Sequence, residues 1–152
     1  TGAAVGALGF GVFVTAMTLG RLFGGTALDR FGRVPVLRAT AALGLAGLLL
    51  VLLGGSPQVA MVGAVLWGFG AALGFPVGMS AGADDPARAA VRVSVVSSIG
   101  YTAFLAGPPL IGLLAEHVGI LQALFVVVGA LTLGLAAAGA ARPLAPSASP
   151  TR

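Results

Sequence analysis

Residues 25–37 read GTALDRFGRVPVL and separate two long apolar segments of the sequence. Because roughly 20 apolar residues are needed to cross the hydrocarbon core of a bilayer, the segments on either side are each long enough to span a membrane. Further outward the same pattern repeats, and the sequence predicts spans at about residues 2–26, 35–54, 58–82, 87–115 and 119–141. The predicted fold class is therefore all-α, a polytopic transmembrane helix bundle of about five spans.

The composition excludes water as the solvent for most of this chain. Hydrophobic residues make up 58% and charged residues 8% of the 152 residues, whereas a soluble domain carries about 25% charged residues. The chain has no cysteine and one histidine, so we predict no disulfide, no metal site and no cofactor. Its net charge of +4 comes from arginines scattered between apolar runs, which argues against a nucleic-acid partner.

Helix-start chemistry marks two of the predicted boundaries. Ser56-Pro57 and Asp85-Pro86 each place a capping side chain before a proline, and proline is well tolerated in the first turn of a helix. Residues 142–152 are rich in proline, serine and alanine. Such a segment cannot bury enough apolar surface to order itself, so we expect a disordered cytoplasmic tail there.

The arginines predict the orientation of the chain. If it crosses the membrane at every span, seven of the eight arginines lie on one side, and the opposite side holds an exposed Glu116-His117 loop but no arginine. By the positive-inside rule the arginine-rich side is cytoplasmic. We therefore expect the N-terminus of this chain outside and its C-terminus in the cytoplasm. Lysine and asparagine are absent, as in proteins from GC-rich genomes, which suggests a bacterial inner membrane.

The quoted stretch resembles the cytoplasmic signature of the major facilitator superfamily, G-x-L-a-D-r-x-G-R-r-x-x-l. The matching positions are Gly25, Asp29, Arg30, Gly32, Arg33 and Leu37. Ala27 and Leu28 reverse the expected order, and Val34 replaces a basic residue. We expect Gly25 to let neighbouring helices approach and Gly32 to allow a sharp return between two spans. An ordinary positive-inside turn would favour the same glycines and arginines but would not require an aspartate.

The resemblance implies both a place in a larger protein and a function. In that family the signature follows helix two and helix eight of a twelve-helix protein made of two similar halves. Since four predicted spans follow the first one here, the chain resembles helices eight to twelve, and we expect a fragment that lacks the N-terminal half. The implied protein is no enzyme but a secondary transporter of an unknown small solute, which works by alternating access in a lipid bilayer. The rival hypothesis is a five-span membrane scaffold or assembly subunit; an upstream reading frame encoding about seven more spans would favour the transporter.

Charged residues at the cytoplasmic face are expected to form a clamp. Arg33 should lie within salt-bridge reach of Asp84 or Asp85, because all three fall on the same side of the membrane and an arginine can hold a carboxylate in a bidentate pair. Asp84 is the freer partner if Asp85 caps the fourth span. The family resemblance implies that Asp29 faces the other half of the transporter, so no comparable contact is expected for it here.

Candidate residues for a solute pathway lie on the polar faces of three spans. They are Trp67, Tyr101, Ser94, Ser98, Thr15, Thr18 and Arg21. Each has a structural alternative: the glycine-rich face around Trp67 is typical of close helix packing, hydroxyls can bond to carbonyls of their own helix, and Arg21 can extend along its stem to the interface. No aspartate or glutamate falls inside a predicted span, so the sequence indicates neither a catalytic dyad nor a membrane-embedded coupling carboxylate.

Overall fold

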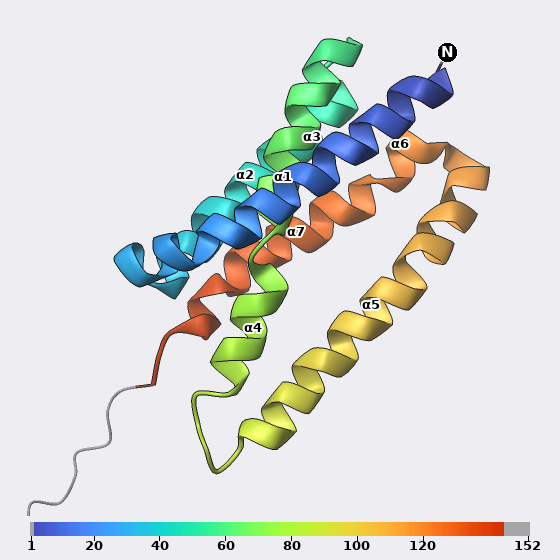
Figure 1. Ribbon diagram of the computed structural model, residues 1–152. Coiled ribbons are helices and arrows are strands. Elements are labelled where there is room, and N and C mark those ends of the chain that lie inside the picture. The colour runs from blue at the N-terminus through green and yellow to red at the C-terminus, as the bar shows by residue number, and fades with distance from the viewer. Residues whose placement is uncertain (1, 145–152) are drawn as a thin grey trace, which may run out of the picture.

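The computed structural model describes residues 2–144, and within that range every regular element is a helix (Figure 1). The elements are α1 (Gly2–Phe31), α2 (Arg33–Leu53), α3 (Pro57–Ala71), α4 (Gly74–Gly82), α5 (Ala89–Val118), α6 (Ile120–Ala123), α7 (Phe125–Ala137) and the 3-10 helix η1 (Ala138–Ala141). Over this part of the chain they provide five segments long and apolar enough to cross a membrane. The predicted fold class is confirmed. Most of the predicted tail, from residue 145 onward, lies outside the described residues.

Glycines with positive φ close the turns between helices. Gly32 has φ 81° and Gly119 has φ 87°, and each is the single residue between two helices. A side chain is strained at such angles, so the expectation for Gly32 is confirmed. Because one residue is enough for each turn, α1 runs on to Phe31 and α5 to Val118. The expectation of a loop at residues 116 and 117 was wrong, since both lie in the last turn of α5.

The two predicted capping residues behave differently. Ser56 is the N-cap of α3, and its hydroxyl accepts a hydrogen bond of 3.3 Å from the Val59 N–H, as predicted. The expectation that Asp85 caps the fourth span was wrong, because α5 begins at Ala89. The Asp85 side chain instead accepts from the Ala87 N–H at 3.1 Å. An Asp-Pro pair readily starts a turn of this kind, and the turn delays the start of the helix.

The third span is divided into two helices. The sequence predicted one span over residues 58–82, whereas α3 ends at Ala71 and α4 begins at Gly74. Pro76 explains the break, because proline has no N–H to donate to the carbonyl four residues earlier and its ring crowds that carbonyl. The glycine-rich face around Trp67 therefore does not continue as the face of one helix beyond Ala71. The fifth span is likewise interrupted, at Leu124 between α6 and α7.

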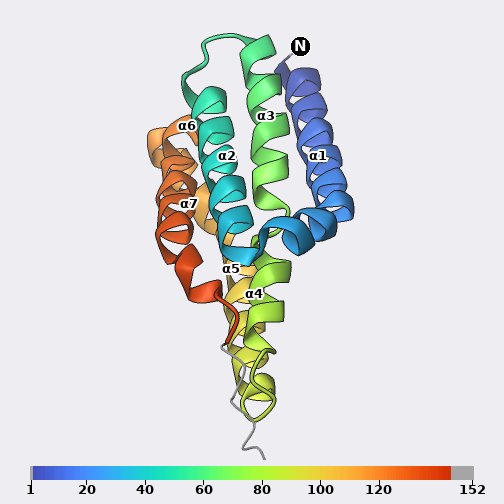
Figure 2. The same cartoon turned by 90° about the vertical axis from the view of Figure 1, so that its left-hand side faces the viewer.

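The central helix of the bundle is α3, which lies between α1 and α2, with α7 on the other side of α2 (Figure 2). Glycines allow this approach. A Cβ added to Gly63 would lie 2.6 Å from the Gly47 carbonyl oxygen, one on Gly70 would lie 2.7 Å from the Thr40 carbonyl oxygen, and one on Gly68 would meet the backbone of α1. The glycine-rich face of the third span thus serves helix packing, which is the structural alternative that the sequence left open.

The 30-residue helix α5 stands apart from this core. It has no buried residue and contacts the rest of the described chain mainly near its ends, through α4 and α6 (Figure 1). Between α5 and α7 lies an open cavity of about 890 Å³. Its lining is apolar except for Ser98 and Thr102 on α5.

Candidate functional site

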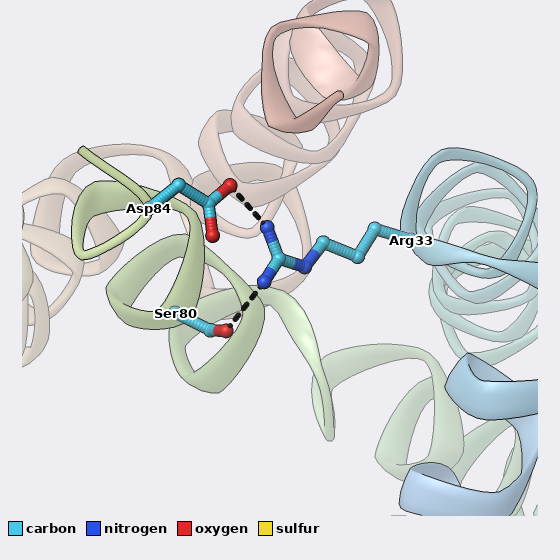
Figure 3. A network of polar contacts seen from close by, with 3 residues as sticks. All are labelled: Arg33, Ser80 and Asp84. Carbon is cyan, nitrogen blue, oxygen red and sulfur yellow. Dashed lines mark hydrogen bonds and ion pairs between the residues drawn. The ribbon is translucent and has the colours of Figure 1, made fainter. Parts of the chain in front are cut away.

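A polar network joins the turn after α1 to the end of α4 (Figure 3). Arg33, the first residue of α2, donates from Nη1 to the Asp84 carboxylate at 2.5 Å and from Nη2 to the Ser80 hydroxyl at 2.9 Å. The Arg33 and Asp84 side chains are 24% and 20% exposed, so the pair is partly shielded from solvent. The predicted contact of Arg33 with an aspartate at 84 or 85 is confirmed, with Asp84 as the partner.

Sequence reasoning missed Ser80 as a member of this network. Its position carried a signal, because residues four apart lie on one face of a helix and Ser80 precedes Asp84 by four. Both acceptors of Arg33 thus lie on one side of α4: Ser80 within the helix and Asp84 just beyond its end. It also brings together two segments that the arginine distribution placed on the same side of the membrane.

The second aspartate has a different arginine partner. Asp85 lies 3.7 Å from the Arg92 guanidinium on α5, so the two neighbouring carboxylates connect α4 to two different helices. Asp84 reaches back to the hairpin formed by α1 and α2, and Asp85 reaches forward to α5. Ion pairs thus connect the turn between α4 and α5 to α2 on one side and to α5 on the other.

The remaining signature residues lie near the end of α1. Asp29 and Arg30 are exposed in its last turn, and the Arg30 guanidinium lies 5.4 Å from the centre of the Phe31 ring. Among residues 2–144 Asp29 forms no ion pair. The interpretation of Gly25 was wrong for this part of the chain, because a Cβ there would meet no atom within 4 Å. It is Gly24 that allows close approach, since a Cβ there would meet the Leu73 side chain.

The two aromatic pathway candidates belong to separate aromatic pairs. Trp67 on α3 is half-buried and packs edge-on against Phe13 of α1, with ring centres 5.0 Å apart. Tyr101 on α5 is 64% exposed and lies 6.4 Å from Phe75 of α4. Trp67 therefore sits in the α1–α3 contact, whereas Tyr101 lies at the α4–α5 contact. Over the described residues they share no aromatic partner.

The four hydroxyl-bearing pathway candidates lie on two helices, the threonines on α1 and the serines on α5. Thr15 and Thr18 donate to the Gly11 and Val14 carbonyls of their own helix, at 2.8 and 2.9 Å. Ser94 and Ser98 are exposed on α5, and Ser98 lines the cavity beside α7. The threonines thus satisfy their hydrogen-bonding capacity locally. All four hydroxyl residues are exposed on the outside of this bundle.

Arg21 makes a contact that the sequence did not predict. Its Nε donates to the Ala72 carbonyl at 3.3 Å, and its Nη2 lies 3.8 Å from the Met17 sulfur. Among residues 2–144 it forms no ion pair. The guanidinium is therefore directed to the break between α3 and α4 by a backbone acceptor.

Comparison with known proteins gives one consistent result. The sequence matches the family described as the Major Facilitator Superfamily over residues 1–152. It is similar to an uncharacterised MFS-type transporter of Yersinia pestis, with 34% identity over 135 residues, which cover 88% of this chain and 35% of that protein.

Two further relatives come from other bacteria. Membrane protein MosC of Rhizobium meliloti is 34% identical over 82% of this chain and 31% of its own length. The uncharacterised transporter y4wD of Sinorhizobium fredii is 34% identical over 80% of this chain and 32% of its own. The chain thus spans about a third of the length of the curated relatives it matches. No solved structure matches it significantly.

Proposed function

This chain belongs to the major facilitator superfamily, and we propose that it forms part of a secondary transporter that moves a small solute across a bacterial inner membrane by alternating access. The family assignment confirms the resemblance of the signature and separates the chain from enzymes. Since the relatives are about three times as long, the proposed transporter includes further spans that are not in this sequence. These would supply the other half of the solute pathway.

The network of Arg33, Asp84 and Ser80 is the observation that carries the proposal. Alternating access requires contacts that hold one end of the protein closed in one state and are broken in the other. A partly exposed ion pair suits that role, because it is strong enough to hold two helices together and near enough to water to be exchanged. Arg33 belongs to the family signature at residues 25–37, which connects the network with the proposed function.

The solute pathway is proposed along the open side of α5. Tyr101, Ser94 and Ser98 are exposed on this helix, and polar groups in a membrane segment need polar partners. In this proposal Trp67 contributes through packing against Phe13 of α1, whereas the hydroxyls of Thr15 and Thr18 bond within their own helix and are not assigned to the pathway. The scaffold hypothesis assigns all of these groups to packing.

Thiol labelling in the full-length protein, freed of other cysteines, tests the transport proposal. We expect Ser98→Cys to react with a membrane-impermeant maleimide in both right-side-out and inside-out vesicles, because a pathway residue is exposed alternately to the two sides. Leu48→Cys is the matched control, since Leu48 is fully buried, and it should stay unlabelled. Labelling of Ser98→Cys from neither side would favour the scaffold.

The proposed orientation has its own test. We expect a tag after Arg152 to be protected from protease added outside cells, and His117→Cys to be labelled from the outside, because the arginine-rich segments share the opposite face. His117 is exposed in the last turn of α5, so its replacement should be reactive. Arg142→Cys is a control that should react only in inside-out vesicles. The reversed pattern would contradict the orientation without affecting the fold.

A further inference from the structure

The break in the third span frees one backbone carbonyl. In a continuous helix the Ala72 carbonyl would accept a hydrogen bond from the N–H four residues later, but that residue is Pro76, which has none. Ala72 is fully buried, so water does not reach this position from the surface. In a bilayer an unpaired carbonyl is especially unfavourable, because the hydrocarbon offers no replacement donor.

Arg21 supplies the missing donor from the neighbouring helix. Its Nε donates to the Ala72 carbonyl at 3.3 Å, and two glycines of α1 bring it within reach. A Cβ on Gly20 would lie 2.7 Å from the Cβ of Ala72, and one on Gly24 would lie 2.9 Å from Cδ1 of Leu73. Gly20 and Gly24 are four residues apart and so share the face of α1 that lies on the break. The close approach and the hydrogen bond are thus parts of one contact.

The first residue of α2, Arg33, holds the far end of α4. Arg33 bonds to Ser80 and to Asp84, just beyond the end of that helix. Both arginine contacts join residues 51 positions apart in the sequence, Arg21 with Ala72 and Arg33 with Asp84. Between them Val77 of α4 packs in the core and is 2% exposed. This nine-residue helix is therefore held at each end by an arginine.

We propose that the break at Ala72 and Leu73 is a hinge for α4 and that Arg21 is its latch. While the hydrogen bond is formed, the freed carbonyl is satisfied and the segment at the break, Ala72 and Leu73, is held against α1. Once it breaks, α4 can turn relative to α3, because Pro76 removes the backbone bond that would keep the two helices in line. The use of this motion in transport rests on the proposed function, whereas the latch itself does not.

A double-mutant cycle in the full-length protein tests the latch. We expect Arg21→Met to lower the ratio of folded to unfolded protein about tenfold in a denaturant titration in detergent, since a hydrogen bond from a charged group is lost. Pro76→Ala restores an N–H at position 76, which can bond to the Ala72 carbonyl. In that background Arg21→Met should cost less than about threefold. Equal effects in both backgrounds would overturn the proposal.

Thiol protection tests the hinge even if Pro76→Ala fails to fold. Leu73 is 6% exposed beside the break, and Leu48 is fully buried in α2 away from it. With a membrane-permeant maleimide, we expect Arg21→Met to raise the labelling rate of Leu73→Cys about tenfold and leave Leu48→Cys unchanged, while Arg21→Lys restores part of the protection. A similar rise at both positions would mean general loosening and would contradict a hinge. Neither readout depends on transport, so an inactive protein with an intact latch would count against the proposed function alone.

Discussion

Replacing Gly70 with alanine is expected to lower the amount of folded protein in the membrane several-fold. The added methyl group would fall on the backbone of Gly44 and lie 2.7 Å from the Thr40 carbonyl oxygen. Backbone atoms cannot give way as a flexible side chain can, so α2 and α3 would have to separate. Overpacking of this kind costs about 3 kcal/mol, a large part of the roughly 5–15 kcal/mol that stabilises a typical protein.

A matched glycine separates this effect from a change in helix propensity. Gly129 lies in α7, and a Cβ there would meet no atom within 4 Å, so Gly129→Ala should leave the unfolding midpoint unchanged or slightly raised. Both variants are compared by membrane abundance and by denaturant unfolding of the purified full-length protein. Equal behaviour of the two variants would show that α2 and α3 do not pack through Gly70.

The sequence was most informative where charge and hydropathy act together. The apolar runs predicted the five spans because a bilayer imposes a minimum length on each. The partner of Arg33 was predictable because Asp84 and Asp85 are two of only four acidic residues in the chain, and both follow a span that ends on the same side. Gly32 was predictable because a one-residue return between helices requires the conformational freedom of glycine.

Contacts between helices were harder to predict, because a projection of one helix contains no information on its neighbours. The pairing of Trp67 with Phe13 depends on how α1 crosses α3, and hydropathy alone does not determine that crossing. Pro76 indicated the break before α4, but the prediction treated residues 58–82 as one continuous span. The hydrogen bond of Arg21 followed from that break and was missed with it. Gly24 was overlooked because the family signature directs attention to Gly25.

The pair of Arg33 and Asp84 lies among three helix ends. Asp84 follows the C-terminal end of α4, which is negative, so its charge alone is unfavourable by about 0.3–1 kcal/mol. Arg33 lies at the positive end of α2 but also two residues beyond the negative end of α1, so the two dipoles oppose each other at this arginine. The attraction between the two charges offsets the cost at Asp84, and Ser80 adds a further hydrogen bond. Loss of Arg33 should thus leave Asp84 worse placed than an ordinary surface charge.

We expect Arg33→Gln or Asp84→Asn to lower the stability of the full-length protein by about 1–2 kcal/mol, between the value for an exposed ion pair and that for a hydrogen bond to a charged group. If the proposed function holds, solute uptake by either variant should also fall roughly tenfold. The double variant should lose little more than either single one, because the two side chains act as a unit. Additive losses, with a coupling below about 0.5 kcal/mol, would show that the two charges act independently.

The charge swap Arg33→Asp with Asp84→Arg is the sharper test. In the swapped protein the arginine at position 84 would suit the negative end of α4, and Ser80 could donate to the new aspartate, because a hydroxyl is both donor and acceptor. The arginine also stays on the same side of the membrane, so the expected orientation is preserved. We therefore expect membrane abundance and unfolding midpoint to return at least to the wild-type values, and uptake to recover if the pair acts only as a clamp. A swapped protein that is stable but inactive would assign Arg33 a role beyond this contact, and one that remains unstable would contradict the clamp itself.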